Sequence, residues 1–393
     1  MQEAGSQQSG GGCKIRVMTW NVNGLSRILK SRFTSLENML NTLHADIVCL
    51  QETKLSKADM ERFEQLAVVP GWQSFFSFCT YRGGYAGTAT FCQESLAPVA
   101  AESGLTGPAT QGNKPPGATV DFPDDEAFWN KYDSAELALM DSQGRCVITD
   151  HSALVVFNVY GLAVTAQDSP RFAMKLHMYE ILQRRVEALV AKGRAVLVVG
   201  DLNIAVALED HCDYADARPS VQSSFLDGRP DRTHLQALLA AAGGPLSDLY
   251  RQHHVGERYS YTVWGGAGAL TGSRPRSRGS RVDYILGGGK LQGSPLAAAC
   301  TASGIDAQLL GSDHAPVWAD INLPASAFAS SGEEGAEQAI LPLDSRTIAR
   351  AGRSSRPTRL ESWLQTPKAQ GRKRKASPLE ETPSPPSRRE ETE

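Results

Sequence analysis

The sequence predicts an α/β fold in which two stacked sheets are covered by helices on their outer faces. Strand-like runs alternate with two or three amphipathic segments, first in one half of the chain and then again in the other. A polar residue directly follows several of these runs, at the position where α/β sheets present reactive groups. At 393 residues, 41% of them hydrophobic, the chain is long enough to bury a large core.

Composition excludes several classes of protein. No stretch of about 18 apolar residues is present, and the first residues lack the apolar segment of a signal peptide, so we expect a soluble intracellular protein. The seven cysteines include no CxxC pair, which argues against a disulfide framework or a zinc ribbon. Residues 346–375 carry ten Lys and Arg and a single Glu, which leaves an acidic body. Such a body binds a polyanion only if bound cations offset its carboxylates.

Composition also divides the chain into three parts. Residues 1–12 are polar and predict a disordered leader, residues 13–323 carry the periodic segments of one folded domain, and residues 324–393 predict a disordered basic tail. Within the tail, residues 357–364 place Leu360, Trp363 and Leu364 at one-turn spacing, a pattern that can dock in a partner's groove. Residues 372–375, Arg-Lys-Arg-Lys, resemble a nuclear-localisation cluster.

The first elements of the domain are strand, helix and strand. Residues 14–20 alternate in polarity and predict a strand that ends in Asn21-Val22-Asn23. Thr34 and Glu37 have the spacing of a capping box, and the apolar stripe that follows predicts a helix. The run Ile47-Val48-Cys49-Leu50 predicts a second, buried strand, with Glu52 just past its end.

An antiparallel pair and a long insertion follow. Residues 71–93 alternate aromatic and small side chains around a glycine-rich turn, which exposes Arg82 and Tyr85 at its tip. Residues 103–135 are rich in Gly, Pro and Asp without periodicity, and we expect a surface insertion there. Residues 146–149 and 153–160 predict two more strands, and Tyr160 closes the second.

The remaining elements carry three further polar sites. Residues 171–192 have apolar side chains at helical spacing and stop at Gly193, and residues 232–242 predict a shorter helix. The Val-rich run 196–200 predicts a buried strand that ends in Asp201-Leu202-Asn203. Period-2 alternation would direct Asp201 and Asn203 to one face. Residues 259–264, 282–286 and 315–321 predict the last strands, with Asp313 and His314 before the final one.

Side chains at these strand exits would form one site. On its own, the Asp201–Asn203 segment is equally well explained as an ordinary turn. Hard oxygen ligands without cysteine suit Mg²⁺, with Mn²⁺ as the alternative. Glu52 is the best single ligand, with Asp313 and Asn21 sharing a second position, and Asp201, Asn203 and His314 complete the candidate metal ligands.

The same side chains suit metal-assisted phosphodiester hydrolysis. An Asp283–His314 pair would orient the imidazole as a cationic donor to a phosphate oxygen. Asp201 would act as base for a water that Asn203 orients, and Tyr160 would donate a hydrogen bond to developing charge. We therefore expect Tyr160, Asp201, Asn203, Asp283 and His314 to be catalytic, without a covalent intermediate.

The motifs WNVNGL, LQETK, GYAG, NVY, GDLN, SRVDY and GSDHAPV resemble, in this order, those of the exonuclease III class of AP endonucleases, within the endonuclease/exonuclease/phosphatase superfamily. The resemblance is closest to the type-2 eukaryotic members and extends from Lys14 to about Leu323. It implies a four-layered α/β sandwich and the roles given above. It also implies a DNA-repair nuclease that cuts 5′ to abasic sites and acts on 3′ ends as exonuclease and phosphodiesterase.

The resemblance extends to partners. It implies duplex DNA with abasic sites or with blocked or recessed 3′ ends as substrate, a monomer, and a tail that reaches the sliding clamp (PCNA). The nucleus is the expected location, with the mitochondrion as a second. Candidate DNA contacts are Asn23, Arg82, Tyr85, Arg171, Trp264 and Arg281.

Four positions depart from the family pattern. Asn23 stands where some members carry Asp, and Ala163 replaces an Asn that contacts phosphate. Ser280 precedes Arg281 where strong abasic endonucleases place a Trp against the abasic sugar, so we expect cleavage at abasic sites to be weaker than 3′ exonuclease activity. Pro357 occupies the usual Gln position of the clamp motif.

Two alternative functions stay open. One is another phosphoesterase of the superfamily, although DNase I-like enzymes use a His near Tyr160 and inositol phosphatases a Cys-Asp-Arg run that this chain lacks. The other is a catalytically silent adaptor that binds DNA or the clamp. Crowding like charges in a cleft is costly, and a silent module has no need of it.

Overall fold

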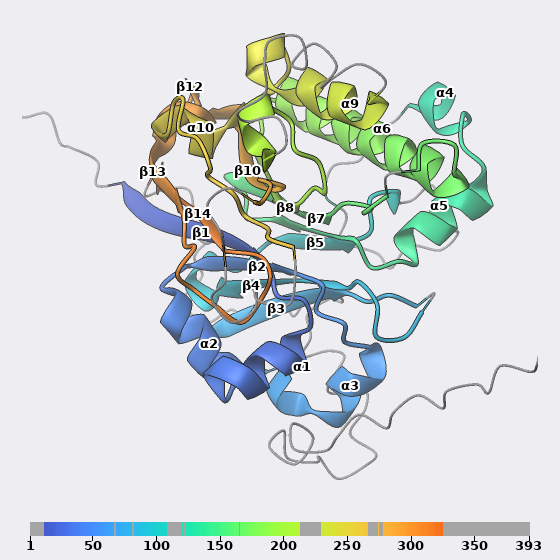
Figure 1. Cartoon of the computed structure of the whole chain (residues 1–393). Coiled ribbons are helices and arrows are strands. Elements are labelled where there is room, and N and C mark those ends of the chain that lie inside the picture. Colours follow the sequence, from blue (N-terminus) through green and yellow to red (C-terminus); the bar gives the residue numbers. More distant parts are fainter. Residues whose placement is uncertain are drawn as a thin grey trace, which may run out of the picture.

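The computed structural model describes residues 12–66, 68–80, 82–107, 120, 123, 125–164, 166–212, 229–265, 274 and 278–324. Two six-stranded sheets stack face to face, and helices cover both outer faces (Figure 1). The predicted four-layered α/β sandwich is therefore confirmed. Except for Gly12 and Pro324, the predicted leader and tail, with Leu360, Trp363 and Leu364, lie outside the described residues.

The first sheet is built around the N-terminal strand. Its order is β13 (Cys300–Ile305), β14 (Val317–Leu323), β1 (Cys13–Asn21), β2 (Ile47–Gln51), β4 (Thr88–Gln93) and β3 (Trp72–Ser77). Strands β1 and β2 are parallel, whereas the other pairs are antiparallel. The parallel pair brings the carboxyl ends of β1 and β2 to the same edge of the sheet.

The second sheet repeats this plan. Its order is β5 (Ala100–Ser103), β6 (Cys146–Asp150), β7 (Leu154–Tyr160), β8 (Ala195–Asp201), β10 (Asp283–Gly288) and β9 (Leu246–Asp248). Strands β7 and β8 are parallel, and β10 runs antiparallel to β8. The carboxyl ends of β7 and β8 therefore meet the first residue of β10.

Helices cover the two outer faces, as Figure 1 shows. The first sheet is covered by α1 (Leu25–Ile28), the π-helical turn η1 (Leu29–Phe33), α2 (Leu36–Leu43) and α3 (Lys57–Arg62). The second is covered by α4 (Glu126–Trp129), α5 (Ser134–Asp141), α6 (Pro170–Ala191) and α9 (Pro230–Leu238). Two short helices, α10 (Leu249–His253) and α11 (Leu296–Ala299), flank β10, β13 and the small β11 (Lys290–Leu291) and β12 (Ser294–Pro295) pair. No helix in the described ranges is long and apolar enough to cross a membrane.

The core lies in three layers that follow from the sequence pattern. Val17, Cys49, Val156 and Leu197 fill the space between the sheets, because strands covered on both sides need apolar residues on both faces. Polar side chains interrupt this layer below the site, where Gln51 Nε2 donates to Asn158 Oδ1 at 2.8 Å. All seven cysteines lie in described segments and are free.

Three local expectations differ from the structure. Ser35, rather than Thr34, caps α2 by accepting a hydrogen bond from the Asn38 amide at 3.0 Å. Residues 259–264 form no regular strand, because Val263 bridges both Ser280 and His314 and crosses between the two sheets. The described part of the 103–135 insertion includes α4 and the first residues of α5, capped by Asp125 and Asp133.

Candidate active site

The polar strand exits converge at one edge of the two sheets. Tyr160 pairs with Asp201 across β7 and β8, and Asp201 pairs with Asp283 across β8 and β10. Asn21 ends β1, and its side-chain Nδ2 lies 2.9 Å from Asp201 Oδ2 and 3.1 Å from Glu52 Oε1. Asn21 therefore joins the exits of both sheets.

The segments after β1 and β8 have the same local structure. The Asn203 amide donates to Asp201 Oδ1 at 2.9 Å, and the Asn23 amide donates to Asn21 Oδ1 at 3.0 Å. Both Asn23 and Asn203 adopt positive φ, at 47° and 52°. Such side-chain-to-backbone turns suit Asp and Asn. Asn203 thus lies beside Asp201 because of this turn, and the expected period-2 alternation is wrong since β8 ends at Asp201.

His314 and Asp283 form the predicted pair. His314 Nδ1 lies 2.9 Å from Asp283 Oδ2, and both side chains are buried. Burial by itself lowers the pKa of His314, but the charges of Asp283 and Asp201 outweigh it and raise that pKa to about 10. The imidazole is therefore cationic at neutral pH and directs Nε2 toward Asp201, 3.9 Å from Oδ2.

Asp201 is a buried carboxylate with an unusually high affinity for a proton. Desolvation and the nearby charge of Asp283 raise its pKa to about 7, although cationic His314 and hydrogen bonds from Asn21 and Asn203 oppose the shift. A group that titrates near neutral pH can take up a proton during a reaction. Asp201 is thus suited to the role of general base.

Glu52 is the centre of an oxygen-rich cluster at the open side of the site. Its Oε2 lies 2.9 Å from the Lys54 ammonium, which also donates to Asn23 Oδ1 at 2.6 Å. Asn23 Nδ2 in turn donates to Asp313 Oδ1 at 2.8 Å. Burial raises the pKa of Glu52, yet Lys54, Asn21 and Tyr160 together hold it below its usual value.

This cluster fits a hard divalent cation. The carboxylates of Glu52 and Asp313 and the amide oxygen of Asn23 gather there without cysteine, and the Lys54 ammonium lies among them. Asn21 directs its amide nitrogen to Glu52, and its oxygen accepts from the Asn23 amide. A second group of potential ligands, one atom each from Asp201, Asp283 and His314, lies within 4.8 Å. In that group His314 Nδ1 already bonds to Asp283, whereas Glu52 and Asp313 offer carboxylate oxygens, so the Glu52 cluster suits a hard cation better.

Tyr160 connects the site to a basic rim. Its hydroxyl donates to Glu52 Oε1 at 2.8 Å, and the guanidinium of Arg145 lies 4.7 Å from its ring centre. Burial and the charges of Glu52 and Asp201 raise the pKa of Tyr160, so the phenol stays protonated. Arg145 and Arg171 both donate to the Tyr85 hydroxyl, at 2.7 and 2.6 Å.

Of the predicted DNA contacts, four lie at the rim and two do not. Asn23, Arg82, Tyr85 and Arg171 are at least partly exposed, and Arg82 lies over the Tyr85 ring at 5.7 Å.

Arg281 and Trp264 are the two corrections. Arg281 is 1% exposed and forms ion pairs with Asp210 at 2.7 Å and with Asp248 at 2.7 Å. Trp264 is 5% exposed and packs with Tyr261 beneath the Arg274 guanidinium. Neither side chain is presented to a duplex, so predicting them as DNA contacts was wrong.

Several residues that support the site were not singled out from the sequence. Lys175 in α6, 1% exposed, donates to the Asn203 carbonyl at 3.0 Å and to Asp231 at 2.9 Å. Arg274 donates to the carbonyls of Ser312 and His314 at 2.7 and 3.0 Å and so holds the loop that carries His314. Lys175 could have been found from the sequence, because a lysine within the apolar stripe of α6 indicates a buried charge. The role of Arg274 depends on tertiary contacts and could not.

A cleft of about 230 Å³ opens beside the catalytic side chains. Asn203, Ser280, Val282 and His314 line it. Ser280 lies in its wall, where the family resemblance places a Trp in strong abasic endonucleases. A small hydroxymethyl group in this wall leaves room for groups other than an abasic sugar.

Comparison with known proteins agrees with this geometry. The Endonuclease/Exonuclease/phosphatase family matches residues 18–314. The chain is 34% identical over 333 residues to DNA-(apurinic or apyrimidinic site) endonuclease 2 of Mus musculus, which covers 79% of this chain and 60% of the mouse protein. It thus spans about 60% of the length of the relatives that it matches first.

Solved structures agree as well. The APE2 catalytic domain of Xenopus laevis superposes with a TM-score of 0.69 at 30% identity and covers 87% of this chain and 99% of that domain. A 3′-5′ exonuclease of Neisseria meningitidis gives a TM-score of 0.54 at 26% identity, with 78% and 99% covered. The match over residues 18–314 shows that the chain belongs to the endonuclease/exonuclease/phosphatase family.

Proposed function

We propose that the protein is a DNA-repair nuclease that hydrolyses phosphodiester bonds 5′ to abasic sites and at 3′ ends. The observation that carries the proposal is the buried pair of a cationic His314 and a proton-accepting Asp201, whose side chains approach each other to 3.9 Å. The relatives named for abasic sites and for 3′-5′ exonuclease activity support this choice of substrate.

The side chains divide the reaction between them. Asp201 takes the proton of a water that Asn203 holds, and the water oxygen forms a bond to phosphorus as the bond to the leaving oxygen breaks. His314, kept cationic by Asp283, donates a hydrogen bond to a phosphoryl oxygen and stabilises the charge that develops there. The Tyr160 hydroxyl stays protonated and orients Glu52. No step requires a covalent intermediate.

A divalent cation belongs to this proposal. Glu52, with Asn21 and Asp313, would hold Mg²⁺, with Mn²⁺ as the substitute, because hard cations prefer carboxylate and amide oxygens. When bound, it would supply positive charge that offsets the negative charge of the phosphate and of the site's carboxylates. The Lys54 ammonium, 2.9 Å from Glu52, must give way or share the carboxylate.

The decisive experiment compares two substrates under the same conditions. Duplex DNA with one abasic site and duplex DNA with a recessed 3′ end are incubated with the wild type, Asp201→Asn and His314→Asn. Both variants should lose about 10²–10⁴-fold in cleavage rate, because each removes one proton-transfer or charge-stabilising group. Glu61→Gln, which changes an exposed carboxylate, serves as control.

Chelation completes the test. EDTA should abolish cleavage of both substrates, and added Mg²⁺ or Mn²⁺ should restore it. Wild-type rates in both variants, or cleavage that resists EDTA, would refute the mechanism and favour the adaptor that binds DNA without cutting it.

Substrate preference should depend on Ser280. We expect weaker cleavage at abasic sites than at 3′ ends, since Ser280 offers the cleft no aromatic surface. Ser280→Trp should raise abasic-site incision relative to 3′ trimming by about tenfold, the worth of one aromatic contact. Ser280→Thr is the matched control. If Ser280→Trp leaves the ratio of abasic-site incision to 3′ trimming unchanged, residue 280 does not determine substrate preference.

The tail would supply location and a partner. We propose a nuclear protein, with the mitochondrion as second location, that acts as a monomer and binds the sliding clamp through Leu360, Trp363 and Leu364. These residues lie outside the described ranges, so the proposal depends on the sequence pattern alone. Replacing Trp363 and Leu364 with Ala should abolish pull-down by purified clamp. If the double variant is still pulled down by the clamp, these residues are part of a linker and do not bind it.

A further inference from the structure

The loop that leaves β8 at Asp201 makes a sharp turn at Asn203. Asn203 has a φ of 52°, a left-handed conformation that asparagine tolerates better than most residues with a side chain. In this conformation its Nδ2 lies 3.1 Å from Asp201 Oδ2 and donates to the Gly161 carbonyl at 3.1 Å. A change in this backbone angle would therefore move the side chain that we assign to the attacking water.

Three consecutive carbonyl groups of the loop, those of residues 202–204, each accept a hydrogen bond from a buried side chain. The donors are, in that order, the Tyr179 hydroxyl and the Lys175 ammonium of α6 and the Tyr284 hydroxyl of β10. The last two distances are 3.0 and 2.8 Å. All three donor residues are at most 1% exposed, so the loop is held through its backbone from the protein interior.

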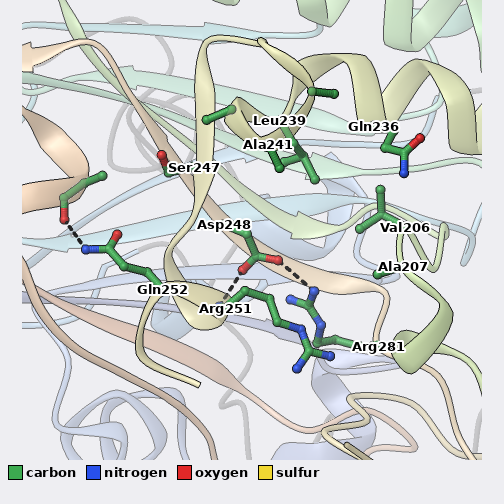
Figure 2. Close-up of a pocket in the computed structure, with 13 residues that line it drawn as sticks. Val206, Ala207, Gln236, Leu239, Ala241, Ser247, Asp248, Arg251, Gln252 and Arg281 are labelled. Atoms are coloured by element: carbon green, nitrogen blue, oxygen red, sulfur yellow. Dashed lines mark hydrogen bonds and ion pairs between the residues drawn. The ribbon is translucent and has the colours of Figure 1, made fainter. Parts of the chain in front are cut away.

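Tyr284 also connects the end of the loop to the ion pairs before β10. Its hydroxyl accepts from the Val206 amide at 3.1 Å and lies 2.9 Å from the Arg281 carbonyl. Val206 and Arg281 both line the cavity of about 580 Å³ shown in Figure 2, where Arg281 is paired with Asp248. Contacts that do not involve α6 therefore fix the end of the loop, whereas α6 holds the part around Asn203.

Lys175 is the charged donor among the three. Its Nζ lies 2.9 Å from Asp231 Oδ2, and Asp231, which is 0% exposed, also pairs with Arg229 at 2.9 Å. This carboxylate offsets the cost of burying the ammonium. A full positive charge can thus rest on the Asn203 carbonyl, and a charged donor makes a stronger hydrogen bond than a neutral one.

The loop after β1 repeats this arrangement with other residues. Asn23 has a φ of 47°, and its amide donates to the side chain two residues earlier, as in the loop after β8. Arg27 donates to the carbonyls of Val22 and Asn23 at 3.3 and 3.1 Å, the same two positions that α6 binds in the other loop. In both loops a cation binds the carbonyl of an asparagine with positive φ. The cation is therefore a feature of the turn and not a by-product of how α6 packs.

We propose that Lys175 is a positioning residue of the reaction, whose ammonium holds the Asn203 carbonyl and so keeps the Asn203 side chain beside Asp201. The proposal rests on the proposed nuclease function. Lys175 does not line the described cleft, so it acts through Asn203 and not on the substrate itself. Its loss should lower kcat and leave KM unchanged, because it removes an arrangement needed only in the transition state.

Two variants of Lys175 test this in steady-state cleavage of duplex DNA with a recessed 3′ end. Lys175→Met keeps the apolar stem but removes the ammonium, and kcat should fall about tenfold to hundredfold, the worth of a hydrogen bond to a charged group. Lys175→Met combined with Asp231→Asn also removes the buried counter-charge, so it measures the same loss without an uncompensated carboxylate in the interior. Thermal melts show that each variant is folded.

Arg185→Met is the matched control. Arg185 lies on the same helix, is 0% exposed and pairs with Glu102 at 2.8 Å, but it contacts neither loop of the site. This variant loses a buried cation as Lys175→Met does, and its kcat should equal that of the wild type. Wild-type kcat in the folded Lys175 variants, or an equal loss in Arg185→Met, would overturn the proposal.

Hydrogen exchange tests the positioning without any need for activity. Mass spectrometry follows the peptide that contains residues 202–206 in the same set of proteins. Both Lys175 variants should exchange this segment about tenfold faster than the wild type, and Arg185→Met should not. Unchanged exchange in the Lys175 variants would refute the positioning role even if cleavage falls. A wild type that cleaves neither substrate would refute the proposed function, and the exchange rates would still decide whether Lys175 holds the loop.

Discussion

Two buried aspartates, nine residues apart, show opposite electrostatics. Asp210, 0% exposed, lies between Arg281 and Arg251, whose charges hold the pKa of its carboxyl below the usual value despite the cost of burial. Asp201, 1% exposed, faces another carboxylate, and burial together with that neighbour raises its pKa to about 7. Equal burial thus gives opposite proton affinities, and the partners decide the sign.

Two neighbouring residues at the start of β10 therefore serve different purposes, one stabilising the fold and the other supporting the reaction. Arg281 and Asp283 lie two positions apart, yet Arg281 forms ion pairs with two aspartates, whereas Asp283 keeps His314 charged. Cleft groups with perturbed pKa values are typical of active sites. The Asp210 cluster instead fixes the frame that holds them.

His314 is the residue whose replacement should affect DNA cleavage most. His314→Gln should lower DNA cleavage about 10²–10⁴-fold, because the cationic donor is lost. His151→Gln is the matched control: His151 is equally buried, but burial lowers its pKa to about 4, so it is neutral. Single-turnover rates measure both. Similar losses in the two variants would mean that the histidine acts through packing alone.

Much of this arrangement was predictable because strand exits in an α/β fold meet at one edge. Periodicity placed Glu52 and Asp201 at such exits and His314 just before the last strand, and the Asp283–His314 pair followed from chemistry. The sequence does not predict that Arg281 is buried. Its partners Asp210 and Asp248 lie 71 and 33 residues away, and only the folded chain brings them together.

Local turns were the other feature that the sequence pattern did not predict. Asn203 reaches Asp201 through a backbone with positive φ, which alternation along a strand does not describe. Residues 259–264 have a strand-like composition, yet the Thr262 hydroxyl accepts from the amides of Val282 and Asp283, and the segment crosses between the sheets. Such contacts with distant segments override the local pattern.

Replacing Arg281 removes the cation that stabilises the fold and leaves the catalytic cation, His314, in place. Arg281→Met leaves the buried Asp210 with Arg251 alone and the half-buried Asp248 without its ion pair, and should lower the free energy of unfolding by about 3–5 kcal/mol. Asp283→Asn should cost far less stability but abolish most cleavage. Urea denaturation and cleavage assays of the same preparations measure both. A larger stability loss in Asp283→Asn than in Arg281→Met would reverse the assignment of the two clusters.

Asp201 should also make the stability of the protein depend on pH. The pKa of Asp201 is higher in the folded state than its ordinary value near 3.8, so its contribution to stability is present at low pH and is lost as pH rises through about 7. Asp201→Asn should therefore stabilise the metal-free protein at pH 8, by about 1–2 kcal/mol, and give no gain at pH 4.

Asp210 should behave in the opposite way. Its folded-state pKa is lowered, so its contribution is present above the ordinary value and is lost only in strong acid. Asp210→Asn should therefore destabilise the protein at pH 8, and the loss should shrink as the pH falls below 4. Thermal melts in EDTA at several pH values compare the two variants directly. Shifts of the same sign at pH 8 would show that burial, rather than the partner, sets the proton affinity of both aspartates.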